Sequence, residues 1–123
     1  MIVDDDKEFL KEFEEMLNLS GYQNRTFPNG EAALKAVKSV QPDLILLDLR
    51  MDGKSGFEVV YDLRKDPATH DIPVIAISAF YTNEDCRRLI KEFNVRKVLV
   101  KPIKPLDVIS EIESVFADNG SST

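Results

Sequence analysis

Short runs of apolar residues alternate along the chain with longer segments in which apolar residues recur every three or four positions. Uninterrupted apolar runs are typical of strands buried on both faces of a parallel sheet, whereas the wider spacing is typical of amphipathic helices. The runs predict strands over residues 1–4, 23–27, 44–48, 73–78 and 97–100. The spaced segments predict helices over residues 6–19, 31–40, 55–64, 83–93 and 105–116.

This regular alternation predicts the α/β fold class, as a (βα)5 doubly wound parallel five-stranded sheet. The flavodoxin-like strand order 2-1-3-4-5 places the first and third strands side by side, at the point where open sheets of this class bind their ligands. We expect one domain over residues 1–117 and a polar C-terminal tail or linker remnant over residues 118–123.

Composition and charge narrow the class of protein. At 123 residues, with 43% hydrophobic and 31% charged residues, the chain is typical of one globular domain. Its net charge of −6 argues against direct binding to nucleic acid. No apolar run approaches the roughly 20 residues that span a membrane. We expect no signal peptide, because no basic segment leads into an apolar one at the start of the sequence. The single cysteine, Cys86, fits a reducing compartment. We therefore expect a cytoplasmic protein without a membrane segment.

Polar side chains gather where the predicted strands end. Four of the five strands are followed or closed by one, and these residues are Asp4 with Asp5, Asp48, Ser78 and Lys101. Because the carboxyl ends of parallel strands share one edge of the sheet, we expect these side chains to converge.

Three carboxylates this close cannot all stay ionised without a proton or a cation, because like charges repel strongly in partly buried surroundings. Oxygen ligands without a nearby histidine or cysteine favour Mg²⁺ over Ca²⁺, held by Asp4, Asp5 and Asp48. The backbone carbonyl of Arg50, on the turn after Asp48, is a candidate for a further ligand. The alternative is that the first acids only favour the start of a helix through its dipole, and we assign that role to Asp6.

Four motifs occur in order along the chain: Val3-Asp4-Asp5, Leu46-Leu47-Asp48-Leu49-x-Met51, Ile77-Ser78-Ala79 and Val100-Lys101-Pro102. Over residues 1 to about 117 they resemble the signature of receiver (CheY-like) domains of two-component response regulators. The resemblance implies that Asp48 is a phosphoacceptor. Its phosphoryl group would come from a sensor histidine kinase, a phosphotransfer protein or a small phosphodonor. It also implies that Asp5 and Asp48 bind Mg²⁺ directly, with Asp4 bound through water.

The same resemblance assigns roles to two further residues. Lys101 is implied to contact a phosphoryl oxygen and, before phosphorylation, to pair with the carboxylates. Ser78 is implied to donate its hydroxyl to the phosphoryl group and to move towards it, which switches the following loop and helix. The peptide bond between Lys101 and Pro102 is expected to be cis. Such a domain is no enzyme in the usual sense, because it catalyses only its own phosphorylation and dephosphorylation.

The chain departs from the family pattern at several positions near this site. Asp52 stands where a proline is usual, and its carboxylate either adds negative charge near the metal or faces solvent. Val98 stands where Tyr or Phe commonly couples the serine movement to the output surface, and Phe80 and Tyr81 are candidate substitutes. Arg50 and Phe80 flank the phosphoryl site, and we expect them to give a long-lived phosphoryl group.

Partners and alternatives complete the expectations. The resemblance implies an output protein or domain on the face formed by the fourth helix, fifth strand and fifth helix. The cation-rich segment 87–97 is either part of that face or simply solvated, and a phosphorylation-dependent homodimer is a further possibility. One alternative is a receiver fold kept only as a binding module and no longer phosphorylated. A less favoured one is a haloacid-dehalogenase-like phosphohydrolase, which needs an acid where Arg50 stands and a cap domain that 123 residues do not supply.

Overall fold

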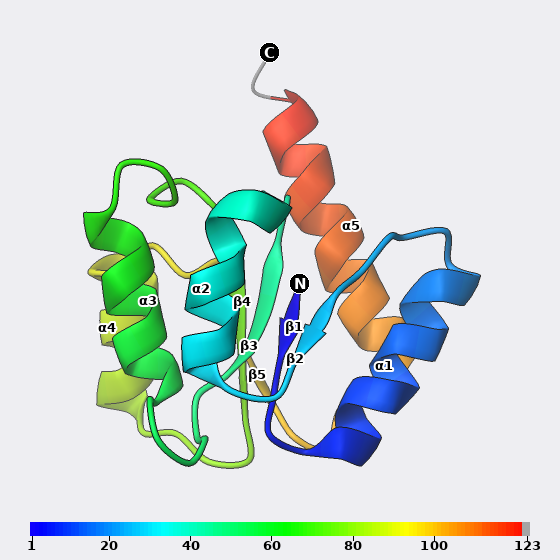
Figure 1. Cartoon of the computed structure of the whole chain (residues 1–123), viewed down its shortest axis with the longest axis horizontal. Helices are drawn as coiled ribbons and strands as arrows, with labels where there is room; N and C mark the ends of the chain where they lie inside the picture. Colours follow the sequence, from blue (N-terminus) through cyan, green and yellow to red (C-terminus); the bar gives the residue numbers. More distant parts are fainter. Residues whose placement is uncertain (122–123) are drawn as a thin grey trace.

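The computed structural model describes residues 1–121 and shows one five-stranded parallel sheet with helices on both faces (Figure 1). The strands are β1 (Ile2–Val3), β2 (Thr26–Phe27), β3 (Ile45–Asp48), β4 (Val74–Ser78) and β5 (Lys97–Val100). The helices are α1 (Lys7–Leu19), α2 (Gly30–Val40), α3 (Gly56–Lys65), α4 (Asn83–Lys91) and α5 (Pro105–Ser121). The strand order is β2-β1-β3-β4-β5, so the predicted fold class and topology are confirmed.

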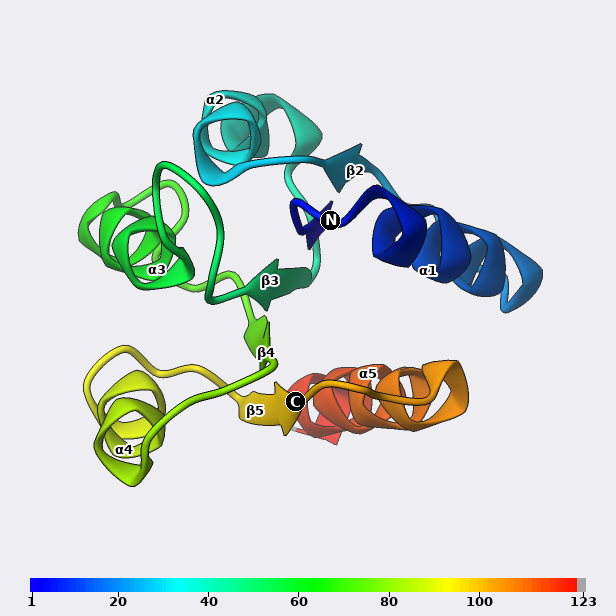
Figure 2. The ribbon, with the colours of Figure 1, turned by 90° about the horizontal axis from the view of Figure 1, so that it is seen from below.

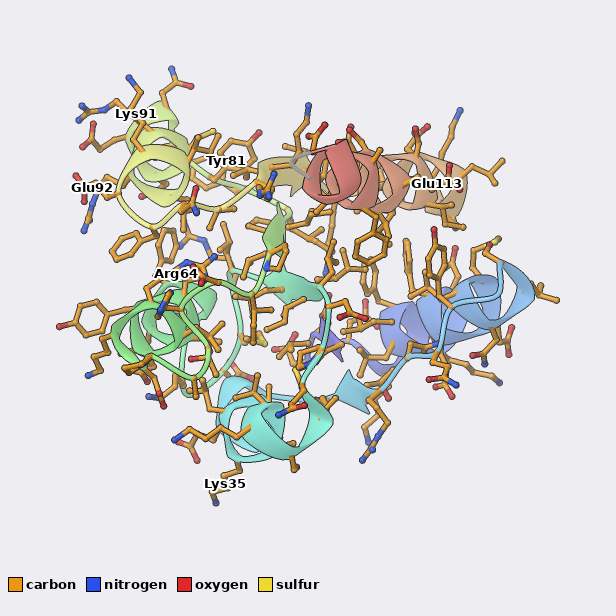
Figure 3. All side chains as sticks on the ribbon, turned by 90° about the horizontal axis from the view of Figure 1, so that it is seen from above. Lys35, Arg64, Tyr81, Lys91, Glu92 and Glu113 are labelled. Atoms are coloured by element: carbon orange, nitrogen blue, oxygen red, sulfur yellow. The ribbon has the colours of Figure 1, made fainter. Side chains whose placement is uncertain are left out.

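The helices divide into two layers. Viewed along the sheet, α1 and α5 lie on one face and α2, α3 and α4 on the other (Figure 2). Side chains fill both spaces between sheet and helices, while Lys35, Lys91 and Glu113 point away from them (Figure 3). Because both faces are covered, β3 and β4 are buried along their whole length. No helix within residues 1–121 is both long and apolar enough to cross a membrane.

The apolar core accordingly has two halves that share the sheet. The α1 and α5 side contains Ile2, Leu10, Phe13, Leu46, Ile75, Ile77, Val108 and Ile112. The other side contains Val3, Val37, Ile45, Leu47, Val60, Val74, Ala76, Leu89 and Val98. Neighbouring strand residues alternate between the halves, which is why the central strands appear as continuous apolar runs rather than alternating ones.

Helix starts follow the capping residues in the sequence. The side chains of Asp6 and Asn29 accept backbone hydrogen bonds at the starts of α1 and α2, and for Asp6 a role at the helix start was predicted. Ser55 and Thr82 form capping boxes at the starts of α3 and α4. Gly21, with φ of +87°, follows the end of α1.

Several boundaries differ from the prediction, most of all at the end of α5 and in the first two strands. Helix α5 continues to Ser121 rather than ending at 116, so residues 118–121 of the expected tail are helical, and residues 122–123 lie outside the described part. Ala117 is a strong helix former, and the helix continues through Asp118, Asn119 and Gly120 although these residues have low helix propensity. Strands β1 and β2 have only two residues each, but the ladder reaches further, since Asp4 N–H donates to the carbonyl of Phe27 at 3.1 Å.

A close backbone approach fixes the end of β3. A Cβ atom on Gly56 would lie 2.5 Å from the carbonyl oxygen of Asp48 and 2.7 Å from Cα of Leu49, a separation that real Cβ atoms do not reach. Glycine therefore lets the first turn of α3 pack directly against the strand end, where its N–H donates to the carbonyl of Leu49 at 3.1 Å. This contact holds the backbone of Asp48 in place.

Candidate functional site

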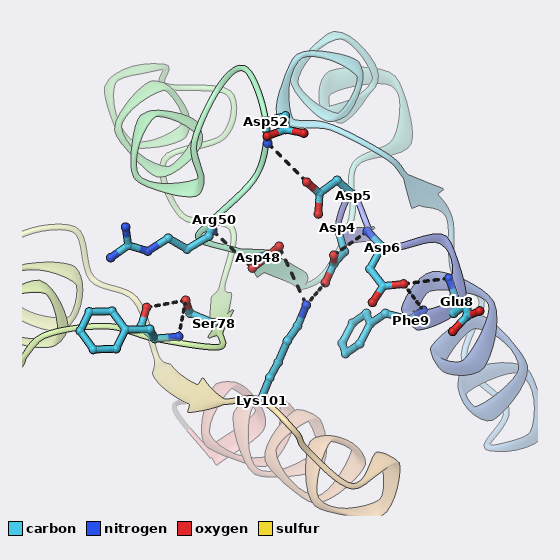
Figure 4. A network of polar contacts seen from close by, with 11 residues as sticks. Asp4, Asp5, Asp6, Glu8, Phe9, Asp48, Arg50, Asp52, Ser78 and Lys101 are labelled. Carbon is cyan, nitrogen blue, oxygen red and sulfur yellow. Dashed lines mark hydrogen bonds and ion pairs between the residues drawn. The ribbon is translucent and has the colours of Figure 1, made fainter.

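Three carboxylates meet at the carboxyl edge of the sheet, as predicted from the strand ends. Asp4 and Asp5 follow β1, Asp48 ends β3, and the two strands are paired with Val3 opposite Leu47. One carboxylate oxygen from each aspartate lies within 4.8 Å of the other two (Figure 4). Asp4 and Asp48 are buried and Asp5 is exposed, so the cluster opens to solvent on the side of Asp5.

Lys101 supplies the positive charge at this cluster. It follows β5, and its Nζ lies 2.7 Å from Oδ2 of Asp4 and 3.9 Å from Oδ2 of Asp48. Its side chain is only 21% exposed, so the ammonium interacts with the carboxylates in partly desolvated surroundings. The peptide bond from Lys101 to Pro102 is cis, as expected.

One ammonium does not balance three carboxylates, and Asp48 is in addition buried beside the other acids. The pKa of Asp48 is raised from its usual 3.8 to about 6, mainly by burial and secondly by the neighbouring charge of Asp4. Lys101 and the backbone N–H of Arg50, which donates to Oδ1 of Asp48 at 3.3 Å, act in the opposite direction. The site therefore favours the arrival of further positive charge.

The donor set matches a hard divalent cation. Asp4, Asp5 and Asp48 offer carboxylate oxygens close enough to share one ion, and oxygen donors of this kind are the ligands that Mg²⁺ prefers. Asp52 contributes its backbone, whose N–H donates to Oδ2 of Asp5 at 3.3 Å, while its side chain is exposed. The Asp52 carboxylate thus faces solvent, and whether it also adds negative charge near the metal stays a prediction. The carbonyl of Arg50 stays a predicted ligand.

Ser78 lies at the same edge but is bonded elsewhere. It is fully buried at the end of β4, and its hydroxyl donates to the carbonyl of Phe80 at 2.7 Å and accepts from the N–H of Phe80 at 3.2 Å (Figure 4). The hydroxyl is thus turned towards its own loop in this state. The sequence predicted the position of Ser78 but not these bonds.

The residues predicted to flank the site contact each other. The guanidinium carbon of Arg50 lies 5.8 Å from the ring centroid of Phe80, and a guanidinium nitrogen lies 3.9 Å from Asp85 in α4. The side chain of Phe80 is 65% exposed, whereas Tyr81 packs against the core cluster that contains Val98. Of the two candidate substitutes for an aromatic at position 98, Tyr81 is therefore the one in contact with that part of the core.

Phe9, in the first turn of α1, also lies at the site, and it was not identified from the sequence. The Nζ atom of Lys101 lies 4.4 Å from the centroid of its ring. A possible signal was its position in the first helical turn after the acidic residues, because that turn starts at the carboxyl edge of the sheet.

Comparisons with known proteins agree with this geometry. The family model for the response regulator receiver domain matches residues 1–113. The chain is 36% identical over 118 residues to the polar-differentiation response regulator DivK of Brucella anthropi, covering 96% of this chain and 95% of that protein. The chain is 35% identical to the protein of the same description from Brucella ovis, also over 118 residues, again covering 96% of this chain and 95% of that protein.

Solved structures agree as well. The N-terminal domain of a response regulator receiver protein from Methanoculleus marisnigri superposes with a TM-score of 0.76 at 33% identity, covering 94% of both chains. A CheY-like receiver domain from Methanospirillum hungatei gives a TM-score of 0.90, covering 99% of this chain and 95% of that one, and at 19% identity it supports the fold alone. The acidic cluster at the sheet edge, the family match and these relatives lead to one conclusion: the chain belongs to the response regulator receiver domain family.

Proposed function

We propose that this chain accepts a phosphoryl group on Asp48 from a sensor histidine kinase, a phosphotransfer protein or a small phosphodonor, and thereby switches a partner-binding surface. The observation that supports this most strongly is the meeting of Asp4, Asp5 and Asp48, with the ammonium of Lys101 2.7 Å from Asp4 and 3.9 Å from Asp48. Residues from three strand ends form this arrangement. Crowding like charges costs free energy, so the cluster does not stabilise the fold, and a role in phosphoryl transfer explains it better.

In the proposed step, a carboxylate oxygen of Asp48 attacks the phosphorus atom of the donor. With a phosphohistidine donor the bond from phosphorus to the imidazole nitrogen breaks, its electron pair stays on that nitrogen, and the ring takes up a proton. With acetyl phosphate the phosphorus–oxygen bond breaks and acetate leaves with the pair. A Mg²⁺ ion held by Asp5 and Asp48, and through water by Asp4, would neutralise negative charge on the phosphoryl oxygens.

Two side chains would then contact the new aspartyl phosphate. We assign to Lys101 an ion pair with a phosphoryl oxygen, which needs only a short movement of its ammonium away from Asp4. Ser78 would turn its hydroxyl from the carbonyl of Phe80 to the phosphoryl group. Since both the N–H and the carbonyl of Phe80 are bonded to this hydroxyl, the turn would release the loop before α4.

The proposed output surface is the face of α4, β5 and α5. Each of these elements carries an exposed apolar side chain, namely Ile90, Val100 and Leu106. On α4 itself, Arg87 pairs with Glu84 within the helix, which favours the solvated interpretation for that cation. We therefore place the contact with an output protein or domain on the apolar residues of this face. The same apolar residues would form the interface of a phosphorylation-dependent homodimer. We expect both contacts to form in the cytoplasm.

A second candidate is a receiver fold that binds partners without being phosphorylated. Val98 favours it, because this small buried side chain replaces the aromatic residue that commonly couples the site to the output surface in the family. The phosphorylation experiment below separates the two candidates.

Incubation with acetyl phosphate and Mg²⁺ should add one phosphoryl group to the parent protein, measured by intact mass, and none to Asp48→Asn. The matched control is Asp52→Asn, which removes a nearby exposed acid and should be phosphorylated like the parent. Phosphorylation of Asp48→Asn, or none of the parent, would contradict the proposal. Continuous turnover of a generic phosphate ester would instead favour a phosphohydrolase.

The raised pKa of Asp48 predicts a pH-dependent stability. Between about pH 4 and pH 6 the folded protein holds a proton on Asp48 that the unfolded chain has already lost, so the parent should lose stability as the pH rises. Asp48→Asn lacks this loss, and its advantage in the free energy of unfolding should grow by about 2 kcal/mol across that range. Urea denaturation in metal-free buffer measures it. An advantage that is the same at pH 4 and pH 7 would be evidence against the raised pKa.

Phe80→Glu should shorten the lifetime of the phosphoryl group. The acid would pair with Arg50 and replace an apolar ring beside the site, which would admit water to the phosphorus atom. We expect phosphate release to accelerate by about three- to tenfold, equivalent to about 1 kcal/mol in activation free energy. Release is followed after removal of the donor, and Phe80→Leu, which stays apolar, serves as the control. Equal rates in Phe80→Glu and the parent would rule out this shielding role.

A further inference from the structure

The ring of Phe9 lies against the ammonium of Lys101, at a distance of 4.4 Å from Nζ to the ring centroid. Phe9 belongs to the first turn of α1, whereas Lys101 follows β5 at the opposite end of the sequence (Figure 4). The ammonium is therefore bordered by Asp4 at 2.7 Å, Asp48 at 3.9 Å and an aromatic ring. The two carboxylates belong to the proposed site, and the ring has no role in the function proposed above.

A closed series of contacts fixes the position of this ring. Oδ1 of Asp4 accepts from the N–H of Asp6 at 2.9 Å, and Oδ1 of Asp6 accepts from the N–H of Phe9 at 3.2 Å. Lys101 completes the series by contacting both Asp4 and the ring. The helix cap and the lysine therefore share Asp4, which ties the first turn of α1 to the charged cluster.

The ring also has a rigid support behind it. Phe9 stacks on Phe13 one turn later, with centroids 4.3 Å apart and an angle of 28° between the planes. Phe13 is 2% exposed and belongs to the core between the sheet, α1 and α5. Movement of the ring away from Lys101 would disturb this packing.

We propose that Phe9 is a positioning residue for Lys101, holding its ammonium between Asp4 and Asp48 so that it can reach the incoming phosphoryl group. A ring face attracts a cation electrostatically, and partial desolvation strengthens the attraction. Unlike a carboxylate, the ring neither neutralises the ammonium nor offers an oxygen that competes with the phosphoryl oxygens. The consequence for phosphoryl transfer rests on the proposed function, whereas the position of the ammonium does not.

The alternative is that Phe9 only fills space beside the core. Replacing its ring hydrogens with fluorine distinguishes the two roles, because fluorination weakens the attraction for a cation while nearly preserving shape and apolar character. The variants needed are Phe9→Leu, Phe9→Tyr and the chain with di- and trifluorinated phenylalanine at position 9. The matched control carries the same fluorinated residues at position 116, where Phe116 pairs with Tyr22 at 6.1 Å.

The first measurement uses the unphosphorylated protein without metal. In NMR spectra, the ring current of Phe9 should shift the side-chain protons of Lys101 upfield in the parent. The shift should persist in Phe9→Tyr and disappear in Phe9→Leu. The rest of the spectrum verifies that each variant is folded. Equal Lys101 shifts in the parent and Phe9→Leu would overturn the proposal, whether or not the protein is phosphorylated.

The second measurement is the rate of phosphorylation by acetyl phosphate at saturating Mg²⁺. Stepwise fluorination at position 9 should lower this rate progressively, to about one tenth with the trifluorinated ring, and Phe9→Tyr should stay close to the parent. Fluorination at position 116 should leave it unchanged. Rates that do not respond to fluorination at position 9 would overturn the proposal. If the parent itself is not phosphorylated, the proposed function fails, and the NMR measurement still tests whether the ring holds the ammonium of Lys101 against it, provided that the Lys101 shifts also respond to fluorination at position 9.

Discussion

Repulsion among three carboxylates is the constraint on which the rest of this site depends. The pairing of β1 with β3 forces Asp4, Asp5 and Asp48 together, and Lys101 compensates only part of their charge. Burial first, and the charge of Asp4 second, raise the pKa of Asp48 to about 6, so keeping this carboxylate ionised in the fold costs free energy. The same unbalanced charge makes the edge attractive to a divalent cation, so a feature that costs stability supports the phosphoryl transfer that we propose.

The scaffold holds these charges by packing rather than by many polar bonds. Covered on both faces, β3 and β4 fix the strand ends, and the close approach of Gly56 to the backbone of Asp48 leaves that residue little freedom. The loop after β4 is held by side-chain contacts instead. Ser78 is bonded to the backbone of the loop it precedes, and Arg50 contacts Phe80 and Asp85 across that loop. Rigid strand ends beside an adjustable loop suit a domain that changes its surface when one group is added.

The sequence predicted the fold because each element carries its own pattern. Continuous apolar runs and three-to-four spacing identified the strands and helices, and the capping residues placed most helix starts within one residue. The meeting of Asp4, Asp5, Asp48 and Lys101 could also be predicted, because parallel strand ends share one edge of the sheet. These inferences need only the topology.

Contacts between side chains on different elements could not be predicted in the same way. The ring of Phe9 beside Lys101, the bonds of Ser78 to Phe80 and the contact of Arg50 with Asp85 depend on side-chain rotamers and loop geometry, which the spacing of residues does not encode. The extra turns of α5 escaped prediction because apolar spacing ends at residue 116 while the helix does not.

The most direct test of the central claim is a Mg²⁺ titration of the unphosphorylated protein, followed by calorimetry and by backbone NMR. The account predicts one saturable site per chain, with the largest shifts at Asp5, Asp48 and Arg50. Affinity should fall at least about tenfold, or about 1.4 kcal/mol, in Asp5→Asn and stay near that of the parent in Asp6→Asn, whose acid caps α1 instead. Equal affinity in the parent and Asp5→Asn, or shifts centred elsewhere, would contradict it.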